Sequence, residues 1–175
     1  MNAERYRIRL AGESELAQLQ DIERAASLLF QNTKYSFLVG AEPGSLEFLR
    51  LQHRSGKVWV VTDSENHPVG FAAAGFIDGS PHLHEVDVLP AHARQGLGTR
   101  LINEVVGWAR AAGYERLTLS TFRDIPWNAP FYGKLGFTAI EKDDLPAGLV
   151  EIRKREHELG LPVDERVCMS LSLVL

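Results

Sequence analysis

The sequence predicts a mixed α/β (α+β) fold in a single domain that spans residues 1–175. Strand-like apolar or alternating runs are interspersed with segments whose apolar residues recur every three or four positions, as in helices. Several strand-like runs precede a helix and a further strand, which indicates an antiparallel meander followed by a β-α-β crossover. The length suits one domain with a substantial core, and 45% hydrophobic with 24% charged residues is the balance of an ordinary globular protein.

The first half of the chain predicts, in order, a strand, two helices and three strands. The first helix carries its apolar residues Leu16, Leu19, Ile22, Ala26 and Leu29 on one face. A polar stretch that contains proline, "SENHP", forms the turn between the first two of the three later strands. The expected elements are strand 6–11, helix 13–30, helix 45–54, and strands 57–63, 69–78 and 82–90.

The second half predicts helices and strands in alternation. Its first helix places Leu97, Leu101, Val105 and Trp108 on one face. The only cysteine, Cys168, lies in an apolar terminal strand, so we expect a buried core residue and not a nucleophile. The expected elements after the first helix are strand 115–122, a short helix 128–137 that ends near Gly136, strand 137–141, a charged helix with loop over 146–160, and strand 166–174.

Composition excludes several classes of protein. The formal net charge of −4 gives no overall basic field to hold nucleic acid. No apolar run approaches the roughly 20 residues of a membrane span, and "MNAERYRIRL" has no apolar core of a secretory signal. A single cysteine excludes internal disulfides, so a reducing cytoplasm is the expected compartment.

The stretch "HARQGLGTRLINEVVGWARAAG" places Gly96 and Gly98 where a strand gives way to a helix. The free N–H groups and the partial positive charge of a helix N-terminus make such a turn a site for phosphate or pyrophosphate. The alternative is a turn softened by glycine with arginines on its surface. A Walker A loop is absent, and a dinucleotide fingerprint would need a third glycine where Leu101 stands.

Two segments carry a resemblance to a known family. "VDVLPAHARQGLGTRLI" resembles the acetyl-CoA pyrophosphate motif of the GNAT superfamily of N-acetyltransferases, and "NAPFYGKLGF" resembles its later coenzyme A and catalytic motif. The resemblance is strongest over 82–140 and extends over 5–175. It implies a central twisted, mixed and largely antiparallel sheet flanked by helices, with acetyl-CoA in a cleft between the fourth and fifth strands.

The resemblance also implies how the cofactor acetyl-CoA is held. Main-chain amides from Gln95 to Thr99 would cradle the pyrophosphate. The family usually has Gln or Arg three residues before the first motif glycine, where this chain has Ala93, so Arg94, Gln95 and Arg100 are the candidate side chains. Asn128 is either an N-cap, a coenzyme A ligand or both. The expected cofactor-binding residues are Val86, Asp87, Val88, Arg94, Gln95, Gly96, Leu97, Gly98, Thr99, Arg100, Ser120, Asn128, Phe131, Tyr132 and Lys134.

Acetyl transfer to an amine needs a base for the amine and an acid for the departing thiolate. Tyr132 stands where similar GNAT enzymes carry the tyrosine acid, and the alternative is a packing role like that of Phe131. His82 and His84 resemble the paired histidines of arylalkylamine N-acetyltransferases and are candidate bases, with Glu85 as the competing carboxylate. No metal is expected, because the His-x-His pair lacks a further cluster of ligands.

The acceptor site is expected around "STFRDIPWNAP" and the segment after the first helix. Aromatic side chains there would form an apolar wall or close the pocket, and Asp124 would attract a cationic amine. The alternative for Asp124 is an ion pair with Arg123 or a capped turn. The expected substrate-binding residues are Phe30, Tyr35, Phe122, Asp124 and Trp127.

The predicted function is direct transfer of an acetyl group from acetyl-CoA to a primary amine of a small molecule, with coenzyme A as product. Acetylation of a protein or peptide amine is the alternative within the same class. A non-catalytic module that senses acyl-CoA and a general nucleotide-binding domain are alternatives from other classes. Nucleic acid and membrane are not expected partners, and a homodimer is an open alternative because GNAT proteins often pair through sheet edges or the C-terminal strand.

Overall fold

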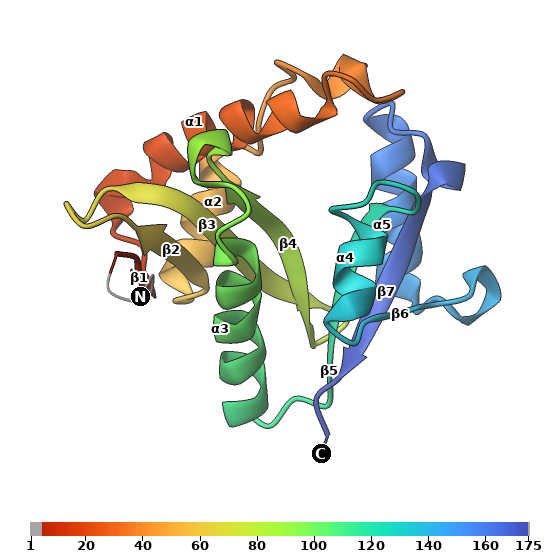
Figure 1. Ribbon diagram of the computed structural model, residues 1–175. Helices are drawn as coiled ribbons and strands as arrows, with labels where there is room; N and C mark the ends of the chain where they lie inside the picture. The colour runs from red at the N-terminus through yellow and green to blue at the C-terminus, as the bar shows by residue number, and fades with distance from the viewer. Residues whose placement is uncertain (1–4, 175) are drawn as a thin grey trace. The chain divides into compact units, whose positions relative to one another are not determined.

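The computed structural model describes residues 5–174, and its seven strands form one mixed sheet in the order β1-β2-β3-β4-β5-β7-β6 (Figure 1). The strands are β1 (Arg7–Leu10), β2 (Val58–Thr62), β3 (Pro68–Ile77), β4 (Ser80–Val88), β5 (Arg116–Phe122), β6 (Thr138–Ala139) and β7 (Arg166–Ser172). The α-helices are α1 (Leu16–Ala26), α2 (Leu46–Arg54), α3 (Leu97–Ala111), α4 (Ala129–Lys134) and α5 (Ala147–Glu158). Short 3-10 helices are η1 (Glu13–Glu15), η2 (Ser27–Phe30), η3 (Ser36–Leu38), η4 (Pro90–His92), η5 (Lys142–Asp144) and η6 (Val163–Glu165).

Contacts within the chain group its described residues into two compact units. The first unit comprises 5–74 and 85–105, and the second comprises 75–84 and 106–174. Strands β3 and β4 and helix α3 each contribute residues to both units.

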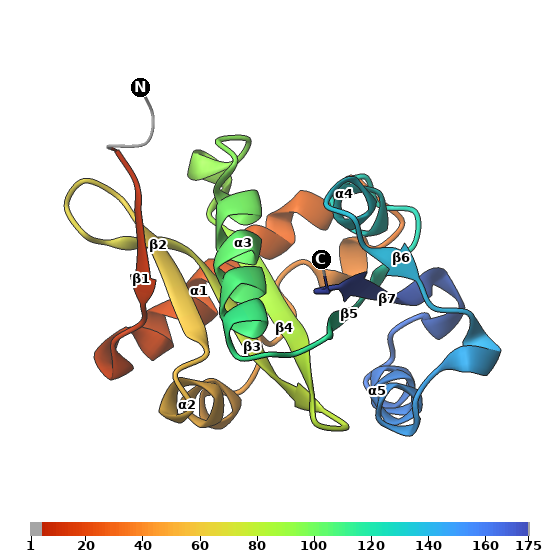
Figure 2. The same ribbon diagram turned by 90° about the horizontal axis from the view of Figure 1, so that it is seen from below.

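The first unit is built on an antiparallel arrangement of β1, β2 and β3. Helix α1 buries Leu16, Leu19 and Ile22, the face that the apolar spacing predicts, against Val60 of β2 and Phe71 of β3. Helix α2 is capped by Ser45, whose hydroxyl accepts the Phe48 N–H, and both helices lie beside β2 and β3 in Figure 2. One apolar core therefore fixes α1 relative to the sheet.

Gly70 brings the main chain of β4 close to β3 in the same unit. A Cβ atom at this position would lie 2.8 Å from the Asp87 carbonyl oxygen and 3.0 Å from methyl groups of Val61 and Val88. The register of β2 and β3 also shifts between Val61 and Thr62. The absence of a side chain at Gly70 thus sets where the C-terminal half of β4, with its acidic residues, lies.

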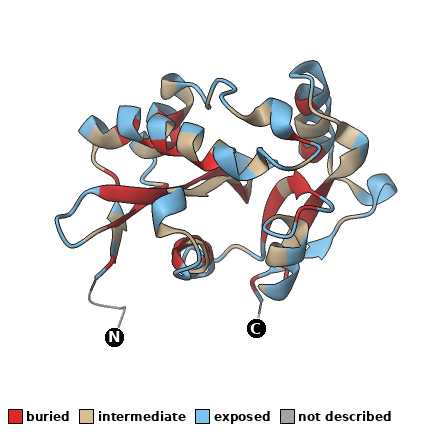
Figure 3. Ribbon diagram, turned by 45° about the horizontal axis from the view of Figure 1, so that its top comes forward, coloured by how far each residue is buried: buried red, intermediate tan, exposed pale blue. Residues whose placement is uncertain are grey.

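In the second unit, β3 and β4 are joined by Asp78 and Gly79, which both have positive φ (51° and 72°), as in a type I′ hairpin turn. β4 pairs in parallel with β5 at His82 and Leu83. β5 then pairs antiparallel with β7, and β7 with β6. Buried residues, red in Figure 3, concentrate on the strands. The predicted core position of Cys168 is confirmed, and burial raises the pKa of its thiol.

The elements predicted from periodicity are confirmed, with shorter ends. The expected helix over 13–30 is an α-helix only in its middle and has a 3-10 turn on either side. The expected strand 137–141 is reduced to two residues. Within the described residues, no helix has the length and apolar character needed to cross a bilayer.

We expect Gly70→Ala to destabilise the protein by about 1–3 kcal/mol, because the new methyl group would press on main-chain and branched side-chain atoms that cannot easily move. Urea denaturation measures the change. The matched control is Gly107→Ala in α3, where a Cβ meets no heavy atom of the described chain within 4 Å. That variant should gain up to about 1 kcal/mol from helix propensity. Equal stability of the two variants would contradict the close approach at Gly70.

Candidate active site

The glycine turn that the sequence singles out is an exposed loop between η4 and α3 in the first unit. Arg94 and Gly96 both have positive φ (57° and 73°), and α3 begins at Leu97. A non-glycine residue at positive φ is uncommon and unfavourable, so the surrounding structure must hold the loop in this shape. Arg94, Gln95 and Gly96 are all exposed.

Two hydrogen bonds fix this loop to the N-terminal segment. The Tyr6 hydroxyl lies 2.9 Å from His92 Nδ1, and Arg100 Nη2 donates to the Tyr6 carbonyl at 3.1 Å. The first intrahelical bond of α3 runs from Arg100 N to Gly96 O. The earlier N–H groups of the helix have no partner within it, which is the arrangement that binds anions. Arg100 therefore holds the loop in place, while Arg94 and Gln95 remain the side chains exposed at it.

Three carboxyl groups meet in the first unit: Glu23 of α1 and Glu85 and Asp87 of β4. One carboxylate oxygen from each lies within 4.8 Å of the others. Glu85 and Asp87 are two positions apart and so share one face of the strand. Glu23 accepts the Gly44 N–H through both oxygens, at 3.0 and 3.1 Å. We call Glu23, Glu85 and Asp87 the carboxyl cluster.

Burial sets the electrostatics of the carboxyl cluster. The Oδ2 atom of Asp87 is buried and has no hydrogen-bond partner within residues 5–174. Burial, reinforced by the nearby charge of Glu23, raises the pKa of Asp87 to about 7, although a hydrogen bond with Glu85 opposes the shift. Burial also raises the pKa of Glu23, against the Gly44 amide and the charge of Arg24. The cluster thus holds a proton near neutral pH.

His82 and His84 lie together in the second unit, as their spacing predicts. Their ring centroids are 4.9 Å apart, and His82 Nδ1 lies 2.8 Å from the Thr118 hydroxyl of β5. Burial, with a smaller effect of His84, lowers the pKa of His82 to about 3, and burial lowers that of His84 to about 4. Both imidazoles are therefore neutral at pH 7. His82 is fully buried and His84 half-buried.

Tyr132 lies on α4 in the same unit and is half-buried. Its ring packs between Phe131 and Phe137, at centroid distances of 5.4 and 5.7 Å. The Tyr132 N–H donates to the Asn128 carbonyl at the start of the helix. The contacts fix the position of the Tyr132 ring. The packing role is therefore compatible with a role of the phenol as an acid.

Two predicted cofactor residues of this unit have other partners. Asn128 occupies the N-cap position of α4, as expected, but its side chain makes no capping bond in the described structure, and its amide donates to the Trp127 carbonyl at 3.1 Å. Ser120 donates to Glu156 at 2.6 Å, within an ion pair of Glu156 with Arg166. Phe131 is half-buried and Lys134 exposed.

The predicted acceptor residues divide into buried and exposed sets. Tyr35 of the first unit and Phe122 of the second are buried, and Phe122 lies under the Arg166 guanidinium at 4.7 Å. Asp124 and Trp127 are exposed and Phe30 is half-buried. The buried pair belongs to the core in this structure, so exposed Asp124 and Trp127 are the better placed candidates.

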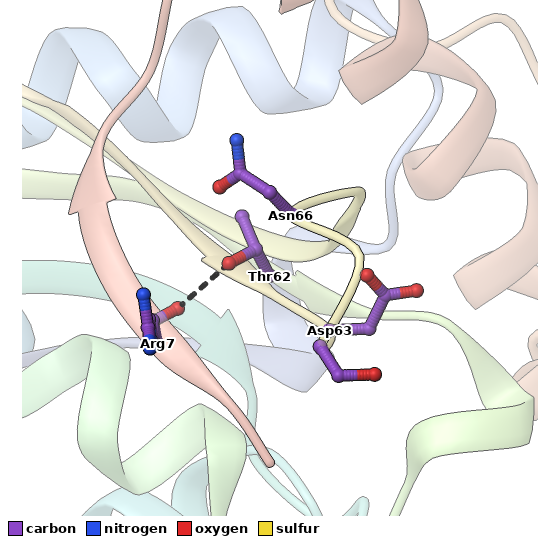
Figure 4. A pocket seen from close by; sticks show the side chains of 5 residues that line it. Arg7, Thr62, Asp63 and Asn66 are labelled. Atoms are coloured by element: carbon purple, nitrogen blue, oxygen red, sulfur yellow. Dashed lines mark hydrogen bonds between the residues drawn. The ribbon is translucent and has the colours of Figure 1, made fainter. Parts of the chain in front are cut away.

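A separate hollow lies at the turn after β2 and contains none of the predicted site residues (Figure 4). It is lined by Arg7, Thr62, Asp63, Ser64 and Asn66. The Thr62 hydroxyl donates to the Arg7 carbonyl there, at 3.4 Å. These are turn and strand-end groups that satisfy the local backbone.

Glu23 is the residue of the carboxyl cluster that the sequence reasoning missed. It stands four positions after Leu19 and directly after Ile22, at the edge of the apolar face of α1. An acidic residue beside a buried helical face was the available signal. Its partners on β4 could not be identified from helical spacing alone.

The buried imidazole of His82 makes stability depend on pH. The unfolded chain binds a proton at His82 below about pH 6.5, whereas the folded chain does not until about pH 3, so stability falls as the pH falls through this window. Between pH 7 and 5 this histidine should account for a loss of about 2 kcal/mol. His82→Gln should remove that share of the pH dependence in urea titrations. His67→Gln, at an exposed side chain, is the control, and an unchanged slope in His82→Gln would contradict the assignment.

For Asp87 the pH dependence of the stability should have the opposite sign, because burial raises the pKa of its carboxyl group. The unfolded side chain ionises near pH 4 while the folded one keeps its proton to about 7, so the cost grows as the pH rises between these values and is constant above. We expect Asp87→Asn to be more stable than the wild type by roughly 1–4 kcal/mol at pH 8, with a gain that shrinks towards pH 4. Urea titrations at several pH values measure it, with exposed Asp143→Asn as control. A loss of stability at pH 8 would show that the buried carboxylate is fully compensated.

Comparison with known proteins supports the family resemblance. The model of the Acetyltransferase (GNAT) family matches residues 19–137. A curated relative, an uncharacterized N-acetyltransferase called YobR from Bacillus subtilis (strain 168), is 33% identical over 66 residues. That match covers 38% of this chain and 27% of the relative's length.

Solved structures agree in fold. An acetyltransferase of the GNAT family from Staphylococcus aureus Mu50 has a TM-score of 0.72, with 18% identity, over 97% of this chain and 99% of its own. The PaiA N-acetyltransferase from Thermoplasma acidophilum, solved in complex with coenzyme A, has a TM-score of 0.66, with 15% identity, over 95% and 98%. Because the family model covers more than half of the sequence, from α1 past α4, the chain belongs to the acetyltransferase (GNAT) family of acyltransferases.

Proposed function

We propose that this protein transfers an acetyl group from acetyl-CoA directly to a primary amine of a small molecule. The observation that carries the proposal is the exposed loop of residues 94–96 at the start of α3, held at positive φ in the segment that matches the family. The positive φ of Arg94 costs free energy, and such strained positions cluster at ligand-binding and active sites. A family in which acetyl-CoA is the donor supplies that ligand.

The residues of the loop suit a pyrophosphate. The N–H groups of Leu97, Gly98 and Thr99 lie at the positive end of α3, where they would donate to phosphate oxygens. Exposed Arg94 would add a charge-assisted contact, and Gln95 a polar one. When bound, acetyl-CoA supplies an activated acetyl thioester. That the PaiA enzyme was solved with coenzyme A supports this assignment.

Tyr132 is proposed as the acid of the reaction. A bond forms between the amine nitrogen and the acetyl carbon, the carbon–sulfur bond breaks, and the phenol gives its proton to the departing sulfur. The contacts with Phe131 and Phe137 restrict the ring, so the hydroxyl is presented in a defined direction. No covalent intermediate on the protein is needed, and the buried thiol of Cys168 takes no part.

His84 is the base that we favour among His82, His84 and Glu85. A primary ammonium must first lose one proton to the solvent to become a nucleophile, and its nitrogen loses a second proton when the new bond to carbon makes it acidic. The second proton suits a weak base, and His84, whose pKa of about 4 keeps it neutral, can accept it. His82 is anchored on Thr118 and orients the neighbouring ring.

The first test is release of free coenzyme A thiol from acetyl-CoA across a panel of small amines and peptides. Tyr132→Phe should lower kcat about 100-fold or more with the best amine, because the acid is lost. Binding of coenzyme A by the variant should be unchanged. Tyr114→Phe, which removes a hydroxyl from an aromatic cluster with Phe76 and Trp108, is the matched control.

Each other outcome of this test rejects a part of the proposal. Release with peptides alone would reassign the acceptor to a protein or peptide amine. Binding of acetyl-CoA without release under any condition would identify a non-catalytic sensor. Equal kcat in Tyr132→Phe and Tyr114→Phe would remove Tyr132 from the acid role.

A further inference from the structure

Thr118 is a buried polar residue in the middle of an apolar stretch of β5. Its neighbours Leu117 and Leu119 are buried, and Thr118 itself is only 3% exposed. Burying a hydroxyl costs free energy unless it finds hydrogen-bond partners, and valine would fill the same space without that requirement. The hydroxyl of Thr118 therefore needs an explanation beyond the packing of the sheet.

The register of the sheet brings Thr118 to His82. Strands β4 and β5 run parallel, and His82 pairs with Thr118. The Thr118 hydroxyl oxygen lies 2.8 Å from His82 Nδ1 and donates to the Pro81 carbonyl at 3.4 Å. All three residues belong to the second unit, so this chain of hydrogen bonds lies within one compact part of the protein.

The single proton of the hydroxyl assigns the tautomer of His82. The Pro81 carbonyl can only accept, so it takes the proton of Thr118, and the hydroxyl oxygen then accepts the N–H of His82 Nδ1. In the opposite arrangement Thr118 would donate to Nδ1, and the ring proton would lie on Nε2, which has no acceptor among residues 5–174. The first arrangement satisfies the carbonyl, the hydroxyl and the ring N–H together.

A fixed His82 ring also defines the position of its neighbour His84. The two rings meet edge to face, with centroids 4.9 Å apart and planes at 63°. Turning the His82 ring over would place a C–H group where Nδ1–H meets Thr118, so the hydrogen bond fixes the orientation of the ring as well as its proton. His84 therefore packs against a ring that is held from β5.

We propose that Thr118 is a positioning residue for acetyl transfer, which fixes the tautomer and the orientation of the His82 ring and, through the ring contact, the direction in which His84 accepts a proton. This assignment rests on the proposed function for the role of His84 as the base. The proton moves from the amine nitrogen to His84, and no bond to Thr118 forms or breaks. A misplaced base slows the reaction without weakening the binding of acetyl-CoA.

The spectroscopic test needs no turnover. The ¹⁵N chemical shifts of the ring nitrogens, measured at pH 7 on protein labelled at histidine, distinguish the two neutral tautomers. The resonances of His82 are identified by their loss in His82→Gln. We expect the proton on Nδ1 in the wild type and in Thr118→Ser. In Thr118→Val, where Nδ1–H has lost its acceptor, the share of this tautomer should fall to about half or less.

The kinetic test compares the same variants with acetyl-CoA and the best amine. Thr118→Val should lower kcat about ten-fold and leave KM for acetyl-CoA unchanged, whereas Thr118→Ser should keep most of the activity. The matched control is Thr121→Val, at the other buried threonine of β5, which should change neither kcat nor the tautomer of His82. Urea midpoints of all variants are measured alongside, so that a lost rate is compared among folded proteins.

The outcomes separate this proposal from the proposed function. A wild type with the proton on Nε2 would overturn the tautomer assignment. Turnover with equal kcat in Thr118→Val and Thr121→Val would overturn the positioning role and keep the acetyltransferase. A failure of Thr118→Ser to retain activity would assign the effect to packing of the methyl group and overturn the role of the hydroxyl. An Nδ1–H tautomer without turnover of any amine would overturn the proposed function and, with it, the positioning role.

Discussion

Desolvation along β4 is the interaction that sets the charges of the candidate site residues on this strand. The strand carries His82, His84 and Asp87, and burial displaces the pKa of each towards its neutral form. The two imidazoles lose their proton far below neutral pH, while the aspartic acid keeps its proton to about 7. At pH 7 the two imidazoles of the strand are therefore neutral, and Asp87 is partly protonated.

The side chains of β4 whose pKa is shifted by burial are able to gain or lose a proton when a ligand binds. An imidazole without a proton is ready to accept one, and a carboxyl group that titrates near 7 ionises when a cation approaches. The fold keeps the two imidazoles neutral at pH 7, and a ligand that changes their surroundings can change their charge. The positive φ at Arg94 is likewise an unfavourable feature that the surrounding structure maintains, here in the backbone conformation and not in a side-chain charge.

The sequence was sufficient for the order of elements and for the family, and insufficient for several side-chain environments. Helical spacing identified the buried face of α1, and two motifs identified the turn before α3 and the helix that carries Tyr132. The environments of Ser120 and Phe122 could not be foreseen, since their partners Glu156 and Arg166 lie more than thirty residues away along the chain. Glu23 was missed for the same reason. Long-range packing, and not local pattern, decides which polar group is buried.

The two units accommodate their buried charged groups differently. In the second unit, Arg166 Nε lies 3.0 Å from Glu156 Oε2, and Glu156 Oε1 accepts a hydrogen bond from the Ser120 hydroxyl. The two charges are paired with each other, although Glu156 Oε2 and Arg166 Nε make no hydrogen bond within the described residues. In the first unit, half-buried Asp87 lies beside two other acids, and its buried Oδ2 atom has no hydrogen-bond partner within residues 5–174. Burial in the first unit is met by a proton held on Asp87 and not by an ion pair of this residue.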